Sequence, residues 1–81
     1  MQIDQYVFHV VSDTLKVPKE KITNQEKLLD LVQDSIQLFE LLMRFEKELG
    51  RNFDYDEVAK IESVGDIIKY AQKLGLQTVK I

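Results

Sequence analysis

The sequence predicts an all-α fold of four helical segments, three longer and one short, with a long loop after the first. Apolar residues recur every three or four positions over residues 3–15 and 35–49, which is the spacing of amphipathic helices. Two pairs of polar residues, each three positions apart, have the pattern of capping boxes, which mark helix starts. No segment gives a convincing strand pattern.

The first helix is expected from about Ile3 to Leu15, and Pro18 ends it because proline lacks the backbone N–H that would continue a helix. A loop of about residues 18–33 follows. Its apolar residues are irregularly spaced, so the loop is expected to pack against the protein. These apolar residues are Ile22, Leu28, Leu29 and Leu31. A loop of this length in a compact domain is usually functional.

The second helix is expected from Ser35 to Leu49, followed by Gly50, a residue that helix ends favour. Asp34 is the predicted N-cap, and Gln37 completes the capping-box pattern. Ser35 then occupies the first helical position, where its hydroxyl is not needed for capping and can face solvent. A free hydroxyl at the positive end of a helix dipole suits a phosphate. The alternative is an ordinary polar residue at a helix start.

The last two helices are expected over about residues 54–59 and 64–74, the latter starting with the capping-box pair Ser63 and Asp66. Residues 76–81 alternate like a strand, but a single strand has nothing to pair with. They are therefore expected to form a packed or frayed extension.

The second helix carries two apolar stripes. The first is expected to face the core and consists of Leu38, Leu41, Leu42, Phe45 and Leu49. The second consists of Ile36, Phe39 and Met43. This second stripe either covers a neighbouring helix or the long loop, or remains free for a partner. Its start beside Ser35 and the flexible thioether of Met43 favour a partner.

The length and composition predict one domain over residues 1–81, without disulfides, cysteine metal sites or a protein thiol nucleophile, because the chain has no cysteine. The start of the chain lacks a signal-peptide pattern and no apolar run approaches membrane-spanning length, so a cytoplasmic protein without membrane insertion is expected. Residues 34–66 hold nine acidic and four basic side chains, which argues against nucleic acid and suits basic protein surfaces.

The sequence offers little for catalysis. His9 is expected on the surface of the first helix, and Ser35 has neither an evident relay nor the Gly-x-Ser-x-Gly setting of a hydrolase. Asp54, Asp56 and Glu57 lack the spacing of a calcium loop. The tyrosines are expected in the core or at its boundary; they are Tyr6, Tyr55 and Tyr70.

Taken together, these motifs resemble the acyl carrier proteins. The matching residues are Asp30-Leu31, Asp34-Ser35-Ile36, Glu40-Leu41, Glu46 to Leu49, Lys60-Ile61, Ser63 to Asp66 and Tyr70. The resemblance implies a four-helix bundle whose Ser35 hydroxyl is esterified with the phosphopantetheine of coenzyme A. The thiol of that arm would carry acyl groups as thioesters, and the chain itself would be a non-catalytic monomer.

The resemblance also implies the partners: a phosphopantetheinyl transferase, an acyl ligase or acyltransferase, and a ketosynthase or other acyl-processing enzyme. Carriers of this family dock on basic patches through an acidic second helix. Asp34, Glu40 and Glu46 match the acidic positions, while Ile36 and Met43 match the exposed apolar ones.

Several residues depart from the family pattern. Val32-Gln33 replaces a typical Gly-Ala, Ile36 replaces Leu, Gln37 and Lys47 replace acids, and Arg44 replaces a small residue. These departures favour a carrier with dedicated partners in fatty-acid, polyketide or related lipid biosynthesis. The alternatives are an aminoacyl or peptidyl carrier, and an unmodified helical interaction domain that uses the second stripe directly.

Overall fold

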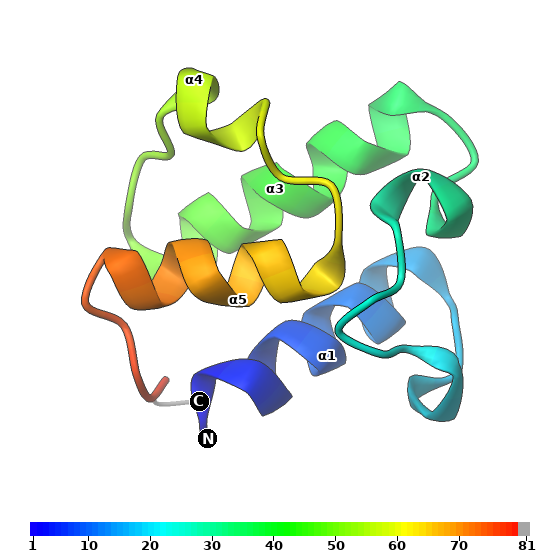
Figure 1. The fold of residues 1–81 in the computed structure, drawn as a ribbon, viewed down its shortest axis with the longest axis horizontal. Coiled ribbons are helices and arrows are strands. Elements are labelled where there is room, and N and C mark those ends of the chain that lie inside the picture. Colours follow the sequence, from blue (N-terminus) through cyan, green and yellow to red (C-terminus); the bar gives the residue numbers. More distant parts are fainter. Residues whose placement is uncertain (80–81) are drawn as a thin grey trace.

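The computed structural model describes residues 1–79, which form five α-helices and one 3-10 helix (Figure 1). The elements are α1 Ile3–Leu15, η1 Lys19–Lys21, α2 Leu28–Leu31, α3 Ser35–Leu49, α4 Tyr55–Val58 and α5 Val64–Lys73. This part of the chain has isolated β-bridges but no strand. None of its helices combines the length and hydrophobicity that a bilayer crossing requires. The predicted all-α bundle is confirmed, with one α-helix more than expected.

Helix α1 contacts both of the other long helices, α3 and α5, and runs below them in the view of Figure 1. Its buried face consists of Ile3, Tyr6, Val7, Val10, Val11 and Leu15. The Tyr6 ring meets Phe45 of α3 edge-on, with 5.9 Å between ring centroids. On α3, the predicted core face is buried at Leu41, Leu42 and Phe45. Its remaining members, Leu38 and Leu49, are half-buried against the same core.

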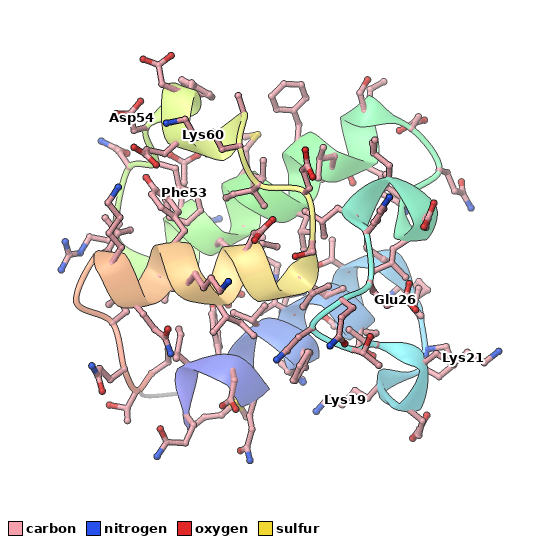
Figure 2. The ribbon with its side chains drawn as sticks, in the orientation of Figure 1. Lys19, Lys21, Glu26, Phe53, Asp54 and Lys60 are labelled. Carbon is pink, nitrogen blue, oxygen red and sulfur yellow. The ribbon has the colours of Figure 1, made fainter. Side chains whose placement is uncertain are left out.

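The segment 18–33 is more ordered than expected, because it contains η1 and α2. Ile22 and Leu28 are buried as predicted and Leu31 is half-buried, whereas Leu29 is 77% exposed. The prediction was wrong for Leu29 because α2 is a single turn that directs Leu28 into the core, so the next side chain faces outward. In η1, Lys19 and Lys21 extend from the surface of the molecule (Figure 2).

Backbone hydrogen bonds tie this segment to the start of α5. They run from Leu28 N–H to Glu62 O (2.9 Å), from Val64 N–H to Glu26 O (3.0 Å) and from Gly65 N–H to Asn24 O (2.9 Å). A Cβ on Gly65 would lie only 2.9 Å from the Asn24 carbonyl oxygen. The close approach of the two backbones therefore requires glycine at this position.

Helix α4 packs on the bundle through the residue that precedes its cap. Phe53 is buried between α4 and α5 (Figure 2), and its ring meets Tyr70 edge-on at 5.2 Å. The Asp54 N–H donates to the Tyr70 hydroxyl oxygen (3.0 Å). Tyr55 was expected at the core or its boundary, but it is 73% exposed. That expectation was wrong because Phe53 already fills the space beneath this single-turn helix.

The described end of the chain pairs with its beginning. Gln2 and Thr78 form an isolated antiparallel bridge, and the Ile3 N–H donates to the Gln77 carbonyl (3.0 Å). The Val79 N–H donates to the carbonyl of residue 1 (2.8 Å). The extension is thus packed rather than frayed over residues 76–79, and its pairing partner is the segment that leads into α1. Residues 80 and 81 of the predicted extension lie outside the described residues.

Candidate functional site

The start of α3 is the candidate functional site (Figure 1). Asp34 has an extended backbone (φ −159°, ψ 177°) and is the N-cap, as predicted. Its Oδ1 accepts a hydrogen bond from the Gln37 N–H (2.9 Å). Ser35 follows as the first residue of the helix, with an exposed side chain. Because Asp34 supplies the cap, the Ser35 hydroxyl has no structural task at this helix end.

The predicted capping box differs from the standard pattern in one of its two bonds. In that pattern the side chain of Gln37 would accept from the N–H of Asp34. Instead, Gln37 Oε1 accepts from the N–H of Gln33, one residue earlier, at 2.7 Å. The box predicted for α5 is complete, with Ser63 and Asp66 each accepting from the other's backbone N–H.

The surroundings of Ser35 fit a phosphate ester. The side-chain hydrogen bonds at this helix end join Asp34, Gln37 and Gln33, and none uses the Ser35 oxygen. The carboxylate at this helix end is that of the N-cap, Asp34, which accepts from the Gln37 N–H, and no further acidic residue lies in the first turn of α3. An anionic group on the Ser35 oxygen would lie at this positive helix end.

The second apolar stripe of α3 is open to solvent. Ile36 is 66%, Phe39 55% and Met43 64% exposed. These residues therefore do not cover a neighbouring helix or the loop, which was the alternative to a partner surface. Three large, exposed apolar side chains along one helix face, beginning next to Ser35, form a surface that another protein can cover.

The three acidic residues expected at a partner surface have different surroundings. Glu40 is exposed on α3, and Asp34 is exposed but uses one oxygen for the helix cap. Glu46 is half-buried, and its Oε2 accepts from the Phe53 N–H (2.9 Å), which fixes the turn after α3. Lys47 is exposed and forms no ion pair within residues 1–79.

Arg44 joins α3 to α1. In the sequence it was noted only as a departure from a family pattern. Its guanidinium lies 2.6 Å from Asp13 Oδ2 and 2.9 Å from Glu48 Oε2, and it donates to Thr14 Oγ1 (3.0 Å). The Tyr6 hydroxyl donates to the other Glu48 oxygen (2.6 Å). The spacing of Arg44 and Glu48 could have suggested an ion pair along the helix. Their partners on α1 follow only from the tertiary packing.

This network shifts the pKa values of its members. Burial, followed by the hydrogen bond to Glu48, raises the pKa of Tyr6 above its ordinary value. The hydrogen bond from Tyr6 is the largest cause that lowers the pKa of Glu48, with Arg44 next. The hydrogen bond from Arg44 lowers the pKa of Asp13. Arg44 is therefore held by internal partners, and its charge is largely balanced within the bundle.

Comparisons with known proteins show what this chain is similar to. The family model described as "Phosphopantetheine attachment site" matches residues 5–71, a range that includes the start of α3. The chain is 38% identical to an acyl carrier protein of Thermotoga maritima over 73 residues, which are 89% of this chain and 90% of that protein. It is 37% identical to an acyl carrier protein of Rickettsia massiliae (89% and 85%) and 34% identical to one of Porphyromonas gingivalis (89% and 94%).

Proposed function

The chain belongs to the acyl carrier protein family, and on that basis we propose that Ser35 is the residue that carries its phosphopantetheine. The observation that supports this assignment is the exposed Ser35 hydroxyl at the first position of α3, left free because Asp34 caps the helix. The positive end of a 15-residue helix also favours the phosphate that the ester would place there.

The reaction at Ser35 is a phosphoryl transfer catalysed by a separate transferase. The Ser35 oxygen forms a bond to the coenzyme A phosphorus that bears the pantetheine chain, and the bond from that phosphorus to adenosine 3′,5′-bisphosphate breaks. The transferase removes the hydroxyl proton. When bound, the arm supplies a thiol that holds acyl groups as thioesters. No cysteine of this chain competes for them.

The rest of the chain holds the serine and offers a docking surface. We assign that surface to Asp34, Ile36, Phe39, Glu40, Met43 and Glu46, because the apolar members are exposed and an exposed acid stands among them. Its partners would be a phosphopantetheinyl transferase, an acyl ligase or acyltransferase, and a ketosynthase or other acyl-processing enzyme. Residues 1–81 would act as one non-catalytic, monomeric carrier domain in fatty-acid, polyketide or related lipid biosynthesis in the cytoplasm.

Intact-mass measurement after incubation with coenzyme A and a broad-specificity phosphopantetheinyl transferase tests the assignment. The wild-type chain should gain the mass of one phosphopantetheine, and Ser35→Ala should gain none. Ser12→Ala, which changes a serine on α1 that donates to the Val17 carbonyl, should still be modified. Failure of the wild-type chain to gain mass with any transferase would instead indicate an unmodified interaction domain.

A further inference from the structure

We propose that Gln37 is a positioning residue for the modification of Ser35, because its side chain holds the Gln33 N–H and so fixes the short connection that precedes the serine. This inference rests on the function proposed above. It concerns the connection between α2 and α3, residues 32–34, which any transferase must approach to reach the hydroxyl.

The two side-chain hydrogen bonds at this helix end bracket Ser35. One runs from the Gln37 N–H to Asp34 Oδ1 (2.9 Å), and the other from the Gln33 N–H to Gln37 Oε1 (2.7 Å). Gln37 thus donates with its backbone to the residue just before the serine and accepts with its side chain from the residue before that. Both bonds form around Ser35 without using its oxygen.

Each residue of the connection has its own tether. Val32 is half-buried against the core, and its N–H donates to the Leu28 carbonyl (3.0 Å). Asp34 is held by the helix cap. Gln33 is exposed, so packing does not hold it, and the bond to Gln37 is the tether that fixes its backbone.

The start of α5 has a related arrangement, in which Asp66, also the third residue of its helix, accepts from the N–H groups of Glu62 (3.0 Å) and Ser63 (3.2 Å). There the connection is also held by the backbone bond from the Leu28 N–H to the Glu62 carbonyl. Within residues 1–79, no such backbone bond holds Gln33, so its position depends more strongly on the side chain of Gln37.

Loss of the bond from the Gln33 N–H to Gln37 Oε1 should impair recognition by the transferase rather than the chemical step. When only a fraction of a protein has the binding-competent conformation, its apparent dissociation constant rises by the inverse of that fraction. Once the transferase has bound, the turn is ordered in either case. We therefore expect KM for the carrier to rise while kcat is nearly unchanged.

The test compares Gln37→Met, which keeps the side-chain length but removes the oxygen, with Gln37→Glu, which keeps an acceptor. Gln72→Met, an exposed position on α5, is the matched control for adding a methionine. The probes are coenzyme A with a broad-specificity transferase, and amide hydrogen exchange of Gln33 measured by NMR on the unmodified chain. Helicity of all variants is checked by circular dichroism.

We expect Gln37→Met to speed exchange at the Gln33 amide and to raise KM for the carrier by about three- to tenfold, the range given by loss of one hydrogen bond. Its kcat should stay within about twofold, a partition that uniform loss of binding predicts. Gln37→Glu should restore both readouts, and Gln72→Met should change neither.

Unchanged exchange at Gln33, or faster exchange with unchanged KM, would overturn the inference. A wild-type chain that accepts no arm would refute the proposed function, whereas the exchange readout would still report whether the tether exists.

Discussion

Gly65 lies where the backbone of residues 24–28 meets the first turn of α5, and both its N–H and its missing Cβ matter there. The N–H donates to the Asn24 carbonyl at 2.9 Å, and a Cβ would stand at the same short distance from that oxygen. The contacting atom belongs to the backbone, so it cannot move aside as the end of a side chain could. One glycine thus sets how closely the long connection approaches α5.

Gly65→Ala should therefore destabilise the protein by about 1–3 kcal/mol, as overpacking of a tight contact does. In an unhindered helix the same change stabilises by about 0.5–1 kcal/mol, so the sign of the effect decides whether the contact matters. Urea unfolding followed by circular dichroism measures it, with Gln72→Ala on the exposed side of α5 as a control expected within about 0.5 kcal/mol. A more stable Gly65→Ala would contradict the close approach.

Arg44 should control the pKa of Asp13, because the hydrogen bond between them is the largest cause of its lowering. In Arg44→Met that pKa should rise toward the ordinary aspartate value. The pKa of Asp66 should stay low, because its largest cause is the Glu62 N–H. Carboxyl titration by NMR measures both groups in one sample. An Asp13 pKa that is equally low in the variant would contradict the network.

Lowered carboxyl pKa values, such as that of Asp13, also affect how the stability of the fold depends on pH. A carboxyl group with a lowered pKa in the folded state stabilises the fold above its unfolded pKa, and this contribution is lost as the pH falls through the folded pKa. The free energy of unfolding of the wild-type chain should thus fall on acidification below about pH 4. It should fall less steeply in Arg44→Met, because Asp13 loses its bond from Arg44, whereas Glu48 keeps the effect of Tyr6 and Asp66 keeps its lowered pKa.

At the scale of elements, the two apolar faces of α3 have different surroundings. Leu41 and Phe45 on one face are fully buried, whereas Ile36, Phe39 and Met43 on the other face are exposed. The acidic residues of α3 also have different roles. Glu46 supports the following turn and Glu48 joins the network to α1, which leaves the exposed Glu40 as the acid that borders the stripe.

Glu40→Lys should weaken docking on a basic partner surface without changing the fold. With a broad-specificity transferase as the probe, KM for the carrier should rise by a few-fold at low salt and approach the wild-type value at high salt, because screening removes the charge term. Glu20→Lys makes the same change of charge on η1 and is the control. Equal effects of the two substitutions would show a response to net charge alone, and would remove Glu40 from the docking surface.

Helices whose start and end signals are local could be predicted from the sequence. The bounds of α1 and α3 agree with the expected ones, and the caps Asp34 and Ser63 occupy their predicted positions. The short helices η1 and α2 were not expected. Residues 24–28, which lead into α2, are held by backbone bonds to residues 62–65, distant in the sequence. An element of three or four residues has too few positions to show a period.

The features of the candidate site also differ in whether the sequence could predict them. Ser35, its cap and the two stripes follow from spacing along one helix, so the sequence was sufficient to predict them. The bond from Gln33 to Gln37 could not be predicted, since its geometry depends on how the chain leaves α2. The contacts of Arg44 with Asp13 and Thr14 depend on how α1 crosses α3.

At the scale of the whole molecule, the described end of the chain pairs with its beginning, and this closure lies at the end of the bundle away from the start of α3 (Figure 1). The segment 76–79 pairs with the residues that lead into α1, so α1 is held at its first turn. Leu76 and Val79 are half-buried against the core, whereas Gln77 and Thr78 between them are exposed. The closure therefore combines backbone pairing with two apolar contacts.

Replacing Leu76 and Val79 together by alanine should lower the free energy of unfolding by about 1–3 kcal/mol, because two partly buried side chains lose their apolar contacts. It should also speed amide exchange at Ile3, whose N–H is bonded to the Gln77 carbonyl. The matched double variant, Gln77→Ala with Thr78→Ala, removes exposed side chains and keeps the backbone, so it should stay within about 0.5 kcal/mol.

Both double variants should accept phosphopantetheine at the wild-type rate under conditions where they are folded, because the closure and the start of α3 lie at opposite ends of the bundle (Figure 1). Urea unfolding, amide exchange by NMR and intact-mass kinetics provide the three measurements. Slower modification of a fully folded Leu76→Ala, Val79→Ala chain would mean that the packing of α1 also determines how Ser35 is presented. The serine would then depend on the whole bundle and not only on its own helix end.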